Sequence, residues 1–222
     1  MVDQDIRTEE GDVTYAIIAD PRERTIDIEE DVDGVLCTGD VLNLAPPPDE
    51  SPEGSLYAEI VGKEGYKSGD VDRILQNIAD MSDTVTGKAI VRYERFLDTV
   101  DEPFYTVMGN QDIPEAYGEK AVSSLEDLEK VHGVDGVVPV FSGLPEGVFP
   151  TEISEESFYD QVKEASGDIL LSHSLPDSFD PEQYGFNHAY CSPSETDRSY
   201  ASDDVTELRS YYTSGAYEII HM

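Results

Sequence analysis

The chain has 222 residues, with 49 acidic and 14 basic side chains, and therefore a formal net charge of −35. Nucleic-acid binding through a basic face is excluded, because neutralising phosphates requires clustered cations and these are scattered singly. The sequence has no apolar run near the roughly 18 residues of a membrane span and no charged-then-apolar leader, so neither a membrane span nor a signal peptide is expected.

The acidic excess predicts the conditions in which the protein works. A surface of one sign repels itself and destabilises the compact state in dilute salt, whereas molar salt screens charges within about 3 Å. We therefore expect a protein of a salt-rich cytosol, as in haloarchaea, or of a viral particle made there. The 38% hydrophobic content and the apolar runs described below favour a folded domain over disorder.

Residues 1–12 are polar and acidic, and we expect them to form an N-terminal arm before one domain over residues 13–222. Four short, continuously apolar runs are typical of strands covered on both faces. These runs are Thr14–Ala19, Gly34–Thr38, Phe104–Met108 and Asp168–Leu171. Cys37, inside the second run, is predicted to be a buried free thiol.

Apolar residues recur at helical spacing in four further stretches. These stretches are Val71–Met81, Ala89–Val100, Ser123–Val131 and Ser154–Ala165. Two more strands are expected, over Val205–Thr213 and Ala216–Ile220. Residues 45–69 are rich in Pro, Gly, Ser and Glu, which predicts a surface insert, either a lid over a site or an interface. Together these elements predict a single α/β domain.

Each of the four apolar runs ends at a polar residue that can bind a ligand. These residues are Asp20, Asp40, Asn110 and His173. Gly, Asp, Asn and Ser also follow strands simply because they form turns, so one such end carries little weight. In open α/β sheets, however, ligands bind at the carboxyl ends of the strands, and four successive ends of this kind predict one shared site.

The order of these residues resembles the motifs of the calcineurin-like metallophosphoesterases. In that family, D-x-H is followed by GD, by GNH with a following Asp or Glu, by a lone His after a strand and by GHxH. The matching positions are Asp20, Gly39-Asp40, Gly109-Asn110-Gln111-Asp112 and Ser172-His173. The resemblance spans roughly Tyr15 to Tyr217 and implies a two-sheet β-sandwich flanked by helices, in four αββα layers.

The resemblance also implies roles for individual residues. In the family two metal ions, about 3.5–4 Å apart, clamp a phosphoryl group and acidify a bridging water. Asp20 matches a ligand of the first ion, Asp40 matches the bridging carboxylate, and Asn110 and His173 match ligands of the second ion. Such mixed oxygen and nitrogen ligands suit Mn, Fe or Zn better than Ca or Mg.

Three departures from the family pattern affect the expected chemistry. Arg22 replaces the His of D-x-H, and a guanidinium has no lone pair with which to bind a metal, although it can pair with Asp20 or Asp40. Gln111 replaces the GNH histidine, and loss of a general acid costs about 10²–10⁴-fold in rate. No GHxH follows His173, and His188 is only a weak candidate for the missing ligand.

We therefore expect a degenerate phosphoesterase scaffold that is non-catalytic or weakly catalytic. It would hold one divalent ion (Mn, Fe or Zn) or none, and serve in binding, regulation or assembly, including in a viral particle. Its partner would be an unidentified protein or a phosphoester ligand. The alternative is an active metal-dependent phosphodiesterase or phosphatase with an altered one-metal site. In that alternative Asn110, Gln111 and Arg22 are the candidate catalytic residues, and Arg22 holds the phosphate.

Overall fold

The computed structural model describes residues 13–44, 54–61, 82–113, 125, 128–138, 151–193, 200 and 202–222. Its strands are β1 (Thr14–Ile18), β2 (Gly34–Cys37), β3 (Phe104–Thr106), β4 (Val131–Val134), β5 (Ile169–Ser172), β6 (His188–Cys191), β7 (Val205–Glu207) and β8 (Glu218–His221). Its helices are α1 (Leu56–Val61), α3 (Ser82–Leu97), α5 (Glu155–Glu164), the 3₁₀ turn η2 (Pro181–Tyr184) and α6 (Tyr211–Ser214). The expected arm over residues 1–12, the expected helix Val71–Met81 and most of the expected insert lie outside these residues.

The strands form two four-stranded sheets. The first has the order β3-β2-β1-β8, with β8 antiparallel to β1 and the other pairs parallel. The second has the order β4-β5-β6-β7 and is parallel throughout. Within the described residues the expected α/β class is thus confirmed. In the first sheet Ile18 lies opposite Cys37, so the residues that follow β1 and β2 leave the sheet at the same edge.

Strand residues alternate between two apolar cores. Ile17 and Leu36 of the first sheet pack with Ile169 and Leu171 of the second. Ile18 points to the opposite face of the first sheet, in a core that also contains side chains of α1 and α3. Because both faces of β1 and β2 are covered, their sequences are continuously apolar rather than alternating.

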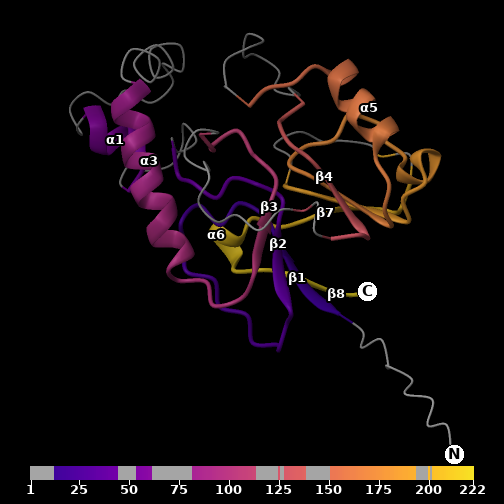
Figure 1. Cartoon of the computed structure of the whole chain (residues 1–222), viewed down its shortest axis with the longest axis horizontal. Helices are drawn as coiled ribbons and strands as arrows, with labels where there is room; N and C mark the ends of the chain where they lie inside the picture. The colour runs from indigo at the N-terminus through magenta and orange to yellow at the C-terminus, as the bar shows by residue number, and fades with distance from the viewer. Residues whose placement is uncertain are drawn as a thin grey trace, which may run out of the picture.

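A third core covers the outer face of the second sheet. Phe158 and Val162 of α5 pack there with Leu170 and Ala189. Figure 1 shows α1 and α3 side by side at one flank of the strands and α5 at the other.

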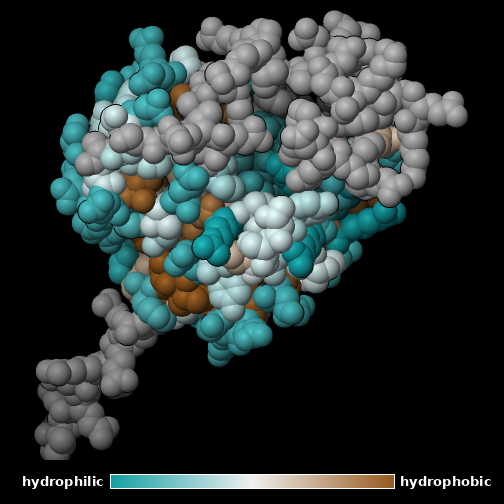
Figure 2. All heavy atoms as spheres, turned by 180° about the vertical axis from the view of Figure 1, so that it is seen from behind, coloured by the Kyte–Doolittle hydropathy of each residue, from teal (hydrophilic) through white to brown (hydrophobic). Residues whose placement is uncertain are grey.

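On the face shown in Figure 2 the described residues are mainly hydrophilic, with hydrophobic ones in separate small patches. Within the described part of the chain, no helix combines the length and the apolar character needed to cross a membrane.

Two helices overlap the stretches expected from the sequence, α5 closely and α3 with shifted bounds. Helix α5 lies within the expected stretch Ser154–Ala165, and the Ser154 hydroxyl caps it by accepting a hydrogen bond from the Ser157 N–H, at 3.1 Å. Helix α3 begins earlier than the expected Ala89, because the stripe of buried residues along it already starts at Val85.

Two other expectations are wrong in part. Val131, predicted to end a helix, begins β4, because it pairs with β5 opposite Ile169. The strand expected over Val205–Thr213 ends at Glu207, and the short helix α6 follows. The Tyr211 N–H at the start of α6 donates to the Ala19 carbonyl, at 2.7 Å, which draws the chain onto the end of β1 instead of extending β7.

Candidate metal centre

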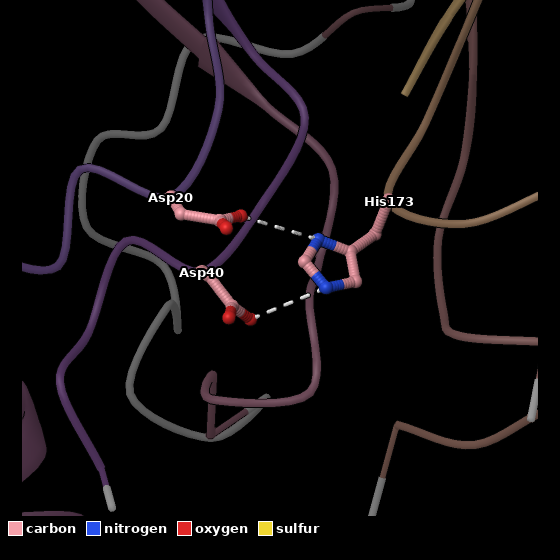
Figure 3. A group of neighbouring side chains, drawn as sticks. All are labelled: Asp20, Asp40 and His173. Atoms are coloured by element: carbon pink, nitrogen blue, oxygen red, sulfur yellow. Dashed lines mark ion pairs between the residues drawn. The ribbon is translucent and has the colours of Figure 1, made fainter. Parts of the chain in front are cut away.

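Asp20, Asp40 and His173 lie together where β1, β2 and β5 end (Figure 3). The two carboxylates come from the first sheet and the imidazole from the second. The three residues are only 6%, 2% and 7% exposed, respectively, and their ligand atoms all lie within 4.8 Å of one another. His173 Nε2 is 3.5 Å from Asp40 Oδ1, and its Nδ1 is 4.0 Å from Asp20 Oδ1. The fourth metal ligand expected from the sequence, Asn110, lies beside this cluster, with Oδ1 3.0 Å from His173 Nε2.

The turns that present the two aspartates are tightly packed. Asp20 and Asp40 have φ angles of 46° and 56°, in the left-handed region that costs a non-glycine residue about 1–2 kcal/mol. A Cβ on Gly109 would lie 2.2 Å from Asp40 Oδ1 and 2.8 Å from His173 Cε1. Only glycine fits at this position, and its small size lets the Asn110 turn approach the Asp40 turn.

Asp112 joins these two turns. Its buried carboxylate accepts hydrogen bonds from the backbone N–H groups of Asp40 (2.9 Å), Leu42 (3.1 Å) and Gly109 (2.8 Å). In return, Asp40 Oδ1 accepts from the backbone N–H of Gln111, at 2.8 Å. The sequence places Asp112 in the GNH-like motif, but its role as the anchor of both turns is visible only in the structure.

The hydrogen bonds of His173 determine what its free nitrogen can bind. Nδ1 lies 2.8 Å from the carbonyl oxygen of Thr38. A carbonyl only accepts, so Nδ1 carries the hydrogen. Nε2 then faces the side-chain oxygens of Asn110, at 3.0 Å, and of Asp40. A proton on Nε2, an Asn110 amide turned so that its NH2 donates to Nε2, or a cation between these atoms would each satisfy this arrangement. A backbone partner on the other nitrogen is typical of metal-binding histidines.

Thr38 and Ser192 hold the ends of the two sheets together beside His173. Their hydroxyl oxygens are 2.7 Å apart, and the Ser192 hydroxyl also lies 3.2 Å from the Thr38 carbonyl. The Ser192 N–H donates to the His173 carbonyl, at 3.1 Å. Sequence reasoning missed both residues, because a single hydroxyl after a strand looks like any turn residue.

Arg22 lies at the edge of the cluster. Its Nη2 is 3.6 Å from Asp40 Oδ2, so Arg22 does pair with a site carboxylate, as its charge suggested. Two buried polar atoms in this part of the site, Asp20 Oδ1 and Arg22 Nε, have no hydrogen-bond partner among the described residues. Buried polar atoms of this kind are the ones that a bound ion or ligand would satisfy.

The remaining candidates lie at different places. Asn110 and Gln111 sit in the turn against Asp40, and Gln111 is buried there. His188 instead lies in β6 opposite Ile169, at the end of that strand away from Ser192, with Nε2 2.6 Å from Thr206 Oγ1. His188 therefore does not belong to the cluster.

Burial and charge act in opposite directions on the three buried groups. Burial raises the pKa of the Asp20 and Asp40 carboxyls, and the nearby cationic groups of His173 and Arg22 only partly offset this. Burial lowers the pKa of His173, but the carboxylates of Asp40 and Asp20 outweigh it, so the pKa of His173 is raised. Without a metal, the cluster therefore retains protons more strongly than the same groups in water.

These directions predict how stability changes with pH. A group with a raised pKa in the folded state gives its full stabilisation below its unfolded pKa, about 6.5 for His and about 3.9 for Asp. That stabilisation is lost as the pH rises through the folded-state pKa. The pKa values of Asp20, Asp40 and His173 are all raised, so each of the three groups makes the folded state less stable as the pH rises. A divalent ion replaces the protons, so its affinity should increase with pH.

We therefore expect Mn²⁺ to raise the melting temperature more at about pH 8 than at about pH 6. Thermal unfolding in molar KCl, with and without Mn²⁺, measures this difference. Equal stabilisation by Mn²⁺ at both pH values would contradict the prediction.

Comparisons with known proteins support the fold but not a family. No protein-family model matches the sequence, and no curated protein matches it. A crystal structure of another protein aligns over 95% of this chain and 95% of its own, with a TM-score of 0.55 and 11% sequence identity. At this identity the likeness concerns the fold alone. The molecule is thus an α/β protein of two sheets with a buried cluster that could hold a metal ion.

Proposed function

We propose that this protein is a degenerate calcineurin-like metallophosphoesterase scaffold that holds one divalent ion and binds a phosphoester with little or no hydrolysis. The order of its motifs supports the family, as does the position of the candidate ligands at the ends of successive strands. The three apolar cores, one between the sheets and one on each outer face, support the four-layer αββα arrangement that the resemblance implies.

The observation that carries the proposal is the convergence of His173 Nε2, Asp40 Oδ1 and Asn110 Oδ1, with the hydrogen of His173 held on the opposite nitrogen. These atoms form a mixed nitrogen and oxygen donor set that suits Mn, Fe or Zn. They are the residues that would hold the ion. Once bound, such an ion supplies a Lewis acid that polarises a phosphoryl oxygen.

Arg22 supports a single ion rather than a pair. Its guanidinium is a permanent cation beside Asp40, so it would repel a second divalent ion bound by Asp20 and Asp40. It also offers a planar fork of donors that matches phosphate oxygens. We therefore assign the phosphate-binding role to Arg22, in place of the charge of the missing ion.

Gln111 supports weak or absent hydrolysis. An amide can donate a hydrogen bond to a phosphoryl oxygen but cannot transfer a proton at neutral pH, and the loss of such an acid costs about 10²–10⁴-fold. The resulting protein would act by binding, in regulation or assembly, in a salt-rich cytosol or in a viral particle made there. The alternative function, a one-metal phosphodiesterase or phosphatase, draws its support from the same Arg22–Asp40 pair.

Calorimetry and turnover assays in molar KCl test the proposal. We expect one Mn²⁺ per chain, phosphate binding that depends on Mn²⁺, and no metal-dependent hydrolysis of 4-nitrophenyl phosphate or its bis-ester. Two bound ions, or none, would contradict the proposal. Hydrolysis that needs one ion and is lost in Arg22→Met would establish the alternative function instead.

A further inference from the structure

The turn that carries Arg22 is tied to helix α3 by one partly buried ion pair. The Glu23 Oε2 atom accepts from Arg92 Nε, at 2.7 Å, and lies 2.6 Å from Arg92 Nη2. The other carboxylate oxygen, Oε1, accepts from the backbone N–H of Asn43, at 2.9 Å. Only 17% of the Glu23 side chain and 15% of the Arg92 side chain are exposed, so this pair is shielded from solvent better than a surface ion pair.

Arg92 also connects the turn to the segment that leads into α1. Its Nη2 donates to the Gly54 carbonyl, and its Nη1 lies 3.7 Å from Oε2 of Glu59 in α1. The Leu56 N–H at the start of α1 donates to the Asn43 carbonyl, at 2.8 Å. Asn43 therefore bonds both to α1 through its carbonyl and to Glu23 through its N–H. One guanidinium thus contacts α1, the segment before it and the Arg22 turn, in the region where α1 lies beside α3 (Figure 1).

The Arg22 turn depends on such external contacts. Asp20, Arg22 and Glu23 have φ angles of 46°, 46° and 64°, and left-handed conformations persist only where the surroundings hold them. On one side the Tyr212 N–H donates to the Asp20 carbonyl, at 3.1 Å. The Arg24 guanidinium donates to the Tyr211 and Tyr212 carbonyls. On the α3 side, the Glu23 carboxylate joins the turn to Arg92 and to the Asn43 N–H. The ion pair with Arg92 is therefore one of several side-chain contacts of the turn and the one that reaches α3.

The metal ligands are held by different contacts. The Asp40 turn is anchored by Asp112, and His173 by Thr38, and neither anchor involves Glu23 or Arg92. The Arg22 turn meets the Asp40 turn through its backbone, since the Arg22 N–H donates to the Asp40 carbonyl, at 3.0 Å. The two halves of the site can therefore be perturbed separately.

We propose that Arg92 is a positioning residue that holds Glu23, and through it the Arg22 guanidinium beside Asp40. Arg92 thereby sets the affinity for the phosphoester without setting the affinity for the metal ion. This inference rests on the proposed function, in which Arg22 binds phosphate. Because Arg92 also holds the Gly54 carbonyl, it connects part of the expected insert, residues 54–61, to the ligand-binding site.

Lys88 provides a matched control for Arg92. It lies one turn earlier on α3 and carries the same charge, and it forms an ion pair with Glu59 of α1. We expect Arg92→Met to weaken phosphate binding to the Mn²⁺-loaded protein about tenfold, which is the lower range for loss of an outer-shell partner. Mn²⁺ affinity should change less than about twofold, and Lys88→Met should change neither affinity. Calorimetry in molar KCl measures both affinities.

A double-mutant cycle separates positioning from general destabilisation. If Arg92 acts through Arg22, then adding Arg92→Met to Arg22→Met should weaken phosphate binding no further. Arg92→Lys should behave like Arg92→Met, because lysine lacks the fork that engages Glu23. Additive effects of the two substitutions, or an unchanged phosphate affinity in Arg92→Met, would overturn the proposal. If Arg92→Met does not fold, Glu23→Gln takes its place in the cycle.

Hydrogen exchange tests the positioning role without any ligand, so it stands even if wild-type protein fails to bind phosphate and the proposed function falls. The backbone N–H groups of Arg22 and Glu23 donate to the carbonyls of Asp40 and Val41. In Arg92→Met these two amides should exchange about tenfold faster than in wild type and in Lys88→Met, because local opening becomes easier. Unchanged exchange would show that Arg92 does not hold the turn.

Discussion

Asp112→Ala is expected to lower the free energy of unfolding by about 4 kcal/mol, because it leaves three buried backbone N–H groups without an acceptor, at about 1–3 kcal/mol each. These donors belong to Asp40, Leu42 and Gly109, so the substitution also releases the two turns of the candidate metal centre from each other. Urea denaturation in molar KCl, followed by circular dichroism, measures the change.

Asp135→Ala is the matched control for this substitution. Asp135 follows β4 directly, and its carboxylate accepts from one backbone N–H, that of Met108, at 3.2 Å. Asp135→Ala should lower the free energy of unfolding by about 1 kcal/mol. If Asp112→Ala costs no more than Asp135→Ala, then Asp112 is not the anchor described above.

Asp40→Asn is expected to weaken Mn²⁺ binding at least about 100-fold, since even outer-shell partners of a metal site contribute about 10–100-fold. The amide keeps the shape of the side chain and removes its negative charge. Asp40 is 2% exposed and faces both His173 and Arg22, so its charge is central to the cluster. Calorimetric titration with Mn²⁺ in molar KCl gives the change in affinity.

Asp31→Asn controls for the altered net charge, because Asp31 is exposed in the loop between β1 and β2. It should leave the Mn²⁺ affinity unchanged. A protein with Asp40→Asn that still binds Mn²⁺ within about threefold of wild type would show that the cluster is not the metal site.

The sequence allowed β1, β2, β5 and much of the site to be predicted, for a local physical reason, whereas the inner strand β6 was not predicted. Strands β1, β2 and β5 are covered on both faces, so their runs are continuously apolar and their ends are sharply marked. His173 directly follows β5, and Asp20 and Asp40 lie shortly after β1 and β2, whose parallel pairing brings the two aspartates to one edge.

What the sequence did not reveal depends on contacts between distant segments. Val131 resembles the end of a helix until it pairs with β5. Asp112 stands in the GNH-like motif, but its role as an anchor appears only once the turns that it joins are placed, and Ser192 resembles an ordinary turn residue until the two sheets are placed. The Glu23–Arg92 pair spans 69 positions in the chain, and in so acidic a sequence no single carboxylate marks its partner.

We propose that Asp40, Asn110 and His173 hold one divalent ion while Arg22 binds phosphate. A crystal grown with Mn²⁺ and phosphate in molar KCl, with diffraction recorded at the manganese absorption edge, tests it most directly. We expect a single anomalous peak bonded to these three side chains, with Arg22 on a phosphate oxygen. Two peaks about 3.5–4 Å apart, with Asp20 bonded to one of them, would contradict the claim, as would the absence of any peak at the cluster.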